Sequence, residues 1–108
     1  GGIPVHPDSR LIMTEERGRA MAETLGDSRA MLLRAHGIVV TGPDIEEMTT
    51  GVYFMEDNAR RTAIAASMGD YETLGEEEMA EISAELLKTR GPIGRVWALA
   101  EIEAQEVC

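Results

Sequence analysis

The sequence predicts an α/β fold, and two stretches of it support that prediction. The run from Leu32 to Val40 is mostly apolar and ends in three β-branched residues, a composition typical of strands. The stretch from Ile45 to Met68 has apolar residues three or four positions apart, which is the period of a helix. With 108 residues, the chain has the size of one domain.

The strand-like run is interrupted at its centre by His36 and Gly37. A glycine allows a backbone bend or a close approach that a side chain would block, so we expect two strands that meet here. A histidine ring buried in such a run needs a hydrogen-bond partner or a metal ion, because an unsatisfied polar group is costly to bury. A satisfied core histidine is the commoner of these two outcomes, and the residues alone leave both open.

Four helices are predicted, over residues 14–26, 45–68, 76–90 and 93–105. Thr14 is the expected N-cap of the first helix, and Gly26 its C-cap. The second helix begins either with Asp44 as its cap or with Pro43 at the first helical position. The pair Gly91-Pro92 is expected to separate the last two helices, because proline does not continue a helix.

Two of these helices have a second apolar face. Tyr53, Phe54 and Ile64 lie off the main apolar stripe of the helix over 45–68. The last helix is apolar on two opposite sides. Since large exposed apolar surfaces mark contacts with other molecules, we expect another subunit to cover these faces.

Composition excludes several kinds of partner. Twenty acidic residues against ten basic ones give a formal net charge of −10, which argues against nucleic acid, because phosphate binding relies on clustered Lys and Arg. The basic residues are dispersed and no apolar run approaches the ~20 residues of a membrane span, so no membrane partner is expected. Cys108 is the only cysteine and cannot form a disulfide within the chain, which favours a cytoplasmic location.

The order of several motifs resembles the class II aldolase/adducin-like family of metal-dependent enzymes. The matching segments are PVHPDSRLI at 4–12, a helix ending in AETLG at 22–26, LLRAHGIVVTG at 32–42, DIEE at 44–47 and an alanine-rich helix up to Gly69. The resemblance implies a three-layer α/β/α fold and makes His36 the last of the family's metal-ligating histidines. It also implies a divalent metal as cofactor, Zn²⁺ first and Mn²⁺ or Fe²⁺ as alternatives, acting as a Lewis acid.

The family's chains are considerably longer, and their upstream half carries a His-x-His pair and a catalytic glutamate. This sequence has two histidines and no such pair. Residues 1–108 are therefore expected to form the C-terminal part of a single aldolase/adducin-like domain, with their own N-terminal half as a partner. Alone, they are not expected to catalyse. The resemblance further implies a homo-oligomer, a ring-like tetramer.

Two residues near the N-terminus are candidate substrate-binding residues, Ser9 and Arg10. Their segment is similar to that of decarboxylase-like members of the family, and a guanidinium can hold a carboxylate or phosphate through two hydrogen bonds. An exposed or ion-paired arginine is the simpler alternative. His6 stands between Pro4 and Pro7 in a stretch expected to be extended, and we expect it to be a solvated loop residue.

The complete protein is expected to be a lyase that cleaves a C–C bond next to a carbonyl or activated carbon, through a metal-stabilised carbanion or enediolate. Its small-molecule substrate would be a hydroxy or keto acid for a decarboxylase, or a sugar phosphate for an aldolase. The family's aldolases use a C-terminal tyrosine as proton donor. The segment after Arg90 has Trp97 but no tyrosine, which favours decarboxylation. A pentulose-phosphate epimerase and a non-catalytic adducin-like interaction module are the alternatives.

Overall fold

The computed structural model describes residues 2–107, so Cys108 lies outside the described residues. The chain divides into two compact units, one ending at Gly42 and the other beginning at Pro43, and each is treated separately below. A three-stranded sheet and four helices confirm the predicted α/β class. Among the described helices, none combines the length and the apolar composition needed to cross a membrane.

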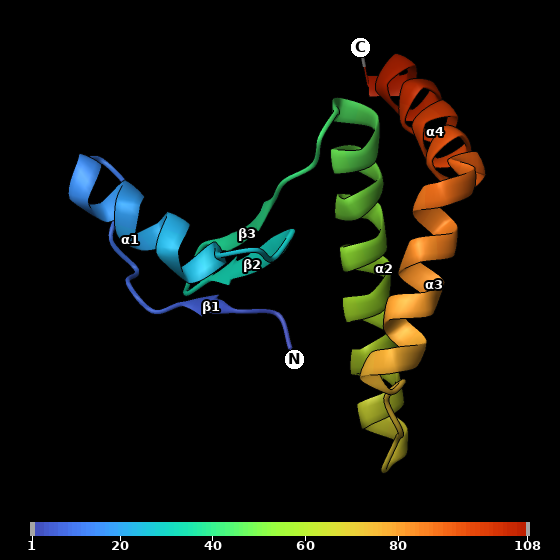
Figure 1. Cartoon of the computed structure of the whole chain (residues 1–108), viewed down its shortest axis with the longest axis horizontal. Helices are drawn as coiled ribbons and strands as arrows, with labels where there is room; N and C mark the ends of the chain where they lie inside the picture. The colour runs from blue at the N-terminus through green and yellow to red at the C-terminus, as the bar shows by residue number, and fades with distance from the viewer. Residues whose placement is uncertain (1, 108) are drawn as a thin grey trace. The chain divides into compact units, whose positions relative to one another are not determined.

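The first unit is built on a small sheet of strands in the order β1-β2-β3, with a helix beside it (Figure 1). The strands are β1 (Val5–His6), β2 (Ala30–Leu33) and β3 (Gly37–Val40), and the helix is α1 (Glu15–Leu25). β1 runs parallel to β2, and β2 runs antiparallel to β3. The run around His36 is therefore a β-hairpin, as predicted, whereas the short strand β1 in the proline-containing segment was not predicted.

The hairpin turn places His36 outside the sheet. Leu33 and Gly37 pair at the ends of the two strands, so three residues, 34–36, form the loop. Ala35 has φ 65° and Gly37 has φ 144°, both in the region that favours glycine. The expectation that His36 is buried within a strand is wrong, because the loop carries its side chain to an exposed position.

Helix α1 has the predicted caps. The side chain of Thr14 accepts a hydrogen bond from the backbone N–H of Arg17, and Gly26 ends the helix with φ 52°. Met31, in β2, is fully buried. Its neighbour Leu32 points to the other face of the sheet and is 40% exposed, so within the described chain only one face of the sheet is covered.

The second unit consists of three helices, α2 (Ile45–Met68), α3 (Glu76–Thr89) and α4 (Gly91–Val107). α4 packs against α2, and α3 adjoins α4 (Figure 1). Asp44 is the N-cap of α2 and accepts a hydrogen bond from the N–H of Glu47, which decides against Pro43 as its first residue. α4 begins at Gly91 rather than at residue 93, because Pro92 is tolerated in the first turn of a helix.

Arg90 connects the beginning of α2 with the junction of α3 and α4. It adopts the left-handed conformation as the C-cap of α3. Its guanidinium lies 3.0 Å from a carboxylate oxygen of Asp44 and 3.3 Å from one of Glu47, whose side chain is buried. Ile93, in the first turn of α4, is 3% exposed. These contacts fix the start of α4 on the start of α2.

The apolar faces of α2 are covered differently from the prediction. The main stripe is half-buried at Met48, Val52 and Met55, but its continuation from Ala59 onward is exposed. Tyr53, expected to face another subunit, instead contacts α4 of the same chain by donating a hydrogen bond to Glu103. The described residues cover Phe54 and Ile64 only in part, leaving them 39% and 54% exposed.

Candidate functional site

The first unit contains a cavity of about 210 Å³, here called the His36 cavity. It is lined by His6, Asp8, Arg10, Leu11, Ile12, Leu33 and His36. The hairpin and the segment after β1 thus bring together His36 and Arg10, two of the three residues that the sequence singled out. The third, Ser9, takes part through its backbone carbonyl, which contacts the ring of His36.

The ring of His36 is held in one orientation by that contact. Its Nε2 atom lies 2.6 Å from the carbonyl oxygen of Ser9. Because a carbonyl oxygen can only accept a hydrogen bond, Nε2 donates, and in the neutral ring the lone pair is on Nδ1. A ring whose one N–H is fixed by a backbone carbonyl and whose other nitrogen has a free lone pair is the usual state of a metal-binding histidine.

The guanidinium of Arg10 is paired with Asp8 along one edge. Nε and Nη2 donate to the Asp8 carboxylate, with distances of 2.9 Å from Nε to Oδ1 and 2.6 Å from Nη2 to Oδ2. Hydrogen bonds from the Arg10 side chain and backbone hold the pKa of Asp8 well below its ordinary value. Asp8 therefore stays ionised and orients the guanidinium. The opposite edge, at Nη1, has no partner within the described chain and can meet a carboxylate.

His6 does not lie where the sequence placed it. It was expected to be solvated, but it is 3% exposed, because β1 turns its side chain toward α1. Its Nδ1 lies 3.0 Å from the hydroxyl oxygen of Thr24. Because prolines flank this segment, no strand was predicted in it. Only the alternation of exposed Val5 with buried His6 could have indicated the two-residue strand.

The donor atoms of the cavity fit one ligand of a metal site. His36 offers a neutral imidazole nitrogen, which zinc, iron and manganese accept. Within residues 2–107, no group of three or more His, Cys, Asp or Glu side chains is placed to hold a metal ion. A metal bound at His36 would therefore need further ligands from elsewhere in the assembly.

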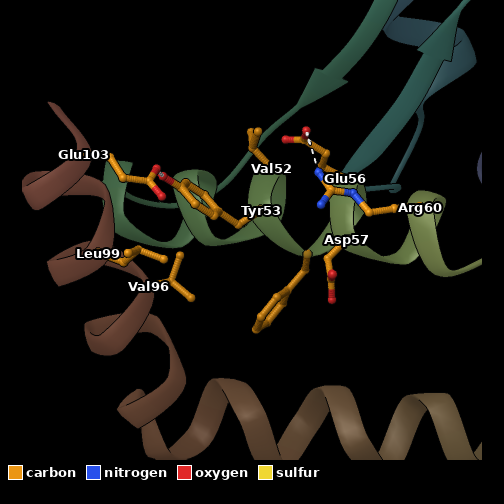
Figure 2. A pocket seen from close by; sticks show the side chains of 9 residues that line it. Val52, Tyr53, Glu56, Asp57, Arg60, Val96, Leu99 and Glu103 are labelled. Atoms are coloured by element: carbon orange, nitrogen blue, oxygen red, sulfur yellow. Dashed lines mark hydrogen bonds and ion pairs between the residues drawn. The ribbon is translucent and has the colours of Figure 1, made fainter. Parts of the chain in front are cut away.

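The second unit contains a larger hollow of about 640 Å³ between α2 and α4, here called the α2–α4 groove (Figure 2). Its apolar floor includes Val52, Val96 and Leu99. Its polar residues are mostly paired with one another: Figure 2 shows the hydroxyl of Tyr53 pointing at the carboxylate of Glu103. This hydrogen bond raises the pKa of Tyr53. None of the described residues that line the groove is a histidine or cysteine, and we assign it a structural role.

Comparison with curated proteins finds two distant relatives. The chain is 28% identical over 69 residues to a 3,4-dihydroxyphthalate decarboxylase of Rhodococcus jostii (strain RHA1). The aligned region covers 64% of this chain and 28% of the relative. The chain is also 25% identical over 83 residues to a 3,4-dihydroxyphthalate decarboxylase of Arthrobacter keyseri. Here the aligned region covers 76% of this chain and 34% of the relative. The matched region thus spans about a third of the length of these relatives. No solved structure matches the chain.

A family model gives the broader assignment. The model of the class II aldolase and adducin N-terminal domain matches residues 1–63, which is more than half of the chain. The matched region includes the whole of the His36 cavity, with the hairpin that positions His36 and the segment that positions Arg10. This chain therefore belongs to the class II aldolase and adducin family.

Proposed function

We propose that this chain is part of a metal-dependent lyase that decarboxylates a hydroxylated aromatic acid. The observation that supports this most directly is the His36 cavity, where an imidazole and a guanidinium stand on the same small, apolar-walled space. The two distant relatives are decarboxylases of 3,4-dihydroxyphthalate, which carries two carboxylates and two hydroxyls on one aromatic ring. The apolar walls, Leu11, Ile12 and Leu33, suit an aromatic ring better than a sugar phosphate.

Four residues at the cavity have a role in this proposal. His36 supplies one ligand of a divalent metal, most simply Zn²⁺, and the metal when bound withdraws electron density from the substrate. Arg10 binds a carboxylate of the substrate with its free edge, and Asp8 keeps the guanidinium in place. Ser9 holds the ring of His36 through its carbonyl. In the reaction, the bond from the ring carbon to the departing carboxylate breaks, CO₂ leaves and the ring carbon takes up a proton.

The proposal extends to the rest of the protein. We place residues 1–108 in the C-terminal part of one three-layer α/β/α domain, whose N-terminal half supplies the remaining metal ligands and a catalytic glutamate. The complete enzyme would be a cytoplasmic homotetramer, and residues 1–108 by themselves would be inactive. Two observations support this division between the two halves: the chain matches about a third of its relatives' length, and the described residues contain no group of three or more side chains placed to hold a metal ion.

The metal content of His36→Ala tests this function. In the full-length protein, we expect the variant to retain less than about a tenth of the wild-type metal, because loss of one ligand weakens a site by more than loss of its supporting residues, which costs ~10–100-fold. Arg34→Ala is the matched control, since Arg34 lies in the same turn and is exposed. Metal is measured by mass spectrometry after dialysis, and CO₂ release from 3,4-dihydroxyphthalate is measured on the same samples.

The possible outcomes separate the candidates. Equal metal content in wild type and His36→Ala would refute the role of His36. Wild-type protein that binds no metal and releases no CO₂ would indicate the non-catalytic adducin-like alternative. If His36→Ala loses the metal and the wild-type protein cleaves a sugar phosphate, His36 keeps its role as a metal ligand and the enzyme is an aldolase instead of a decarboxylase.

A further inference from the structure

The hydrogen bonds around His6 fix which of its nitrogens is free. The Thr24 hydroxyl has one hydrogen, and it donates this hydrogen to the carbonyl oxygen of Ala20 at 3.0 Å. The same hydroxyl oxygen lies 3.0 Å from Nδ1 of His6, so it must accept there, and Nδ1 must donate. In the neutral ring, the lone pair of His6 is consequently on Nε2.

Nε2 of His6 is an unusual atom in this structure. It is buried and has no hydrogen-bond partner among the described residues, whereas nearly all buried polar groups in proteins have one. The side chain is 3% exposed, so bulk water does not compensate. The ring also borders the His36 cavity. Because Nε2 itself has almost no exposed surface, a donor that enters the cavity must displace the atoms that cover it, and it would then remove the cost of leaving this acceptor unsatisfied.

We propose that His6 is a specificity-determining residue of this cavity: its Nε2 accepts a hydrogen bond from a hydroxyl group of an aromatic acid whose carboxylate is bound by Arg10. The inference rests on the proposed function and names the feature of the substrate that this chain recognises. The His6 ring, with its acceptor beneath the surface, the guanidinium of Arg10 and the apolar side chains of the cavity match a hydroxylated ring with a carboxylate. A site with a buried acceptor discriminates against the analogue that lacks the hydroxyl, because the acceptor then stays unpaired.

Two substitutions separate the two nitrogens of the ring. His6→Asn keeps a donor near the position of Nδ1, so it retains the contact with Thr24 but lacks the acceptor at Nε2. His6→Gln reaches the position of Nε2 with an amide oxygen, so it retains an acceptor there. The two variants differ by one methylene and have the same charge, which makes each the control of the other.

The experiment measures binding of 3-hydroxybenzoate, 4-hydroxybenzoate and benzoate to the full-length protein by calorimetry. These acids lack adjacent hydroxyls that could chelate a metal. We expect wild type to bind one of the hydroxylated acids about tenfold more tightly than benzoate. His6→Asn should lose this preference while its benzoate affinity stays unchanged, and His6→Gln should keep most of it.

A second measurement uses only the wild-type protein, so its result does not depend on whether the variants fold. The ¹⁵N resonance of Nε2 in wild-type His6 should shift when the preferred hydroxybenzoate is added and stay in place with benzoate. An unshifted resonance, or a hydroxyl preference that survives in His6→Asn, would overturn the proposal. So would loss of bound metal in His6→Asn equal to that in His36→Ala, which would make His6 a metal ligand instead.

Decarboxylation of 3,4-dihydroxyphthalate by the same wild-type preparation distinguishes the two levels of inference. Activity without a His6-dependent hydroxyl preference would leave the proposed function standing and refute the role of His6. A His6-dependent preference without activity would support the binding site and refute the reaction. Protein that binds none of the three acids and releases no CO₂ from 3,4-dihydroxyphthalate would contradict both.

Discussion

Two hollows of this molecule, the α2–α4 groove and the His36 cavity, differ in how their polar groups are used. The α2–α4 groove is the larger, at about 640 Å³ against about 210 Å³ for the His36 cavity. Yet in the groove Tyr53 is bonded to Glu103, and Arg60 lies 3.9 Å from Glu56. In the cavity, Nε2 of His6 and one edge of Arg10 have no partner in the described part of the chain.

This difference shows that size is a poor guide to a binding site. Polar groups that satisfy one another hold helices together and leave nothing for a ligand to bind. A buried acceptor without a partner costs stability, and such a group is therefore informative about function. The family match covers every residue that lines the cavity, whereas it covers the α2 side of the groove and not the α4 side.

The largest expected effect comes from Arg10 in the cavity compared with Tyr53 in the groove. In the full-length protein, Arg10→Gln should lower kcat/KM for 3,4-dihydroxyphthalate about 100-fold, because a charge-assisted two-point contact with a carboxylate is lost. Arg10→Lys should lose about tenfold, since the ammonium keeps the charge but not the planar fork. Tyr53→Phe should stay within about twofold of wild type, since surface positions away from a site contribute little.

Steady-state kinetics on the three variants check this ranking. A drop in kcat/KM for Tyr53→Phe comparable with that for Arg10→Gln would break the distinction between site and scaffold. Unchanged kinetics in Arg10→Gln would mean that Arg10 pairs with Asp8 but does not bind the substrate, and Arg10 would no longer belong to the proposed site.

The next effect concerns stability and belongs to the second unit. Arg90→Ala removes the guanidinium from Asp44 and from the buried carboxylate of Glu47. We expect the free energy of unfolding to fall by about 1–3 kcal/mol, because a buried charge loses a counter-charge. Arg60→Ala is the control: its ion pair with Glu56 is exposed on both sides and should contribute less than about 0.5 kcal/mol. Urea denaturation measures both, and equal losses would contradict the assignment.

A smaller effect of opposite sign is expected in the hairpin turn of the first unit. Ala35 has φ 65°, a conformation that costs an L-residue about 1–2 kcal/mol and glycine nothing. Glycine also adds about 0.4–1 kcal/mol of entropy to the unfolded chain, so Ala35→Gly should stabilise by about 0.5 kcal/mol. The same urea titration tests it. A destabilised variant would mean that the methyl group of Ala35 makes a contact that outweighs its strain.

Local sequence patterns predicted the regular elements well because their determinants are local. Asp44 and Thr14 cap the helices that they were expected to cap, and the helix from Ile45 to Met68 has the predicted bounds. The hairpin around Gly37 was also predicted from its neighbours along the chain. The class of the fold follows from these elements, whereas the arrangement of layers depends on contacts that a local pattern does not contain.

The site was predicted only in part, for the same reason. His36 and Arg10 were identified from a family resemblance, and the structure places both on one cavity. His6 was missed because its burial depends on Thr24 of α1, a contact between distant positions of the chain. The exposure of His36 was also missed, since the hairpin loop consists of residues 34–36 and so includes His36, whereas Gly37 already belongs to β3.

The smallest expected effect is a change in the pKa of Asp8, which reports how firmly Arg10 is held in the cavity. Hydrogen bonds from Arg10 lower the pKa of Asp8, whose ordinary value is 3.8. A lowered pKa in the folded state stabilises the fold above the ordinary value, and this contribution is lost as the pH falls through the lower, folded value. The pair should therefore persist at pH 3, where free aspartate is mostly protonated. NMR titration of the Asp8 carboxyl carbon measures this directly: in Arg10→Gln the midpoint should return toward 3.8, and in Tyr53→Phe it should not move. A midpoint near 3.8 in wild type would show that the guanidinium is not oriented by Asp8.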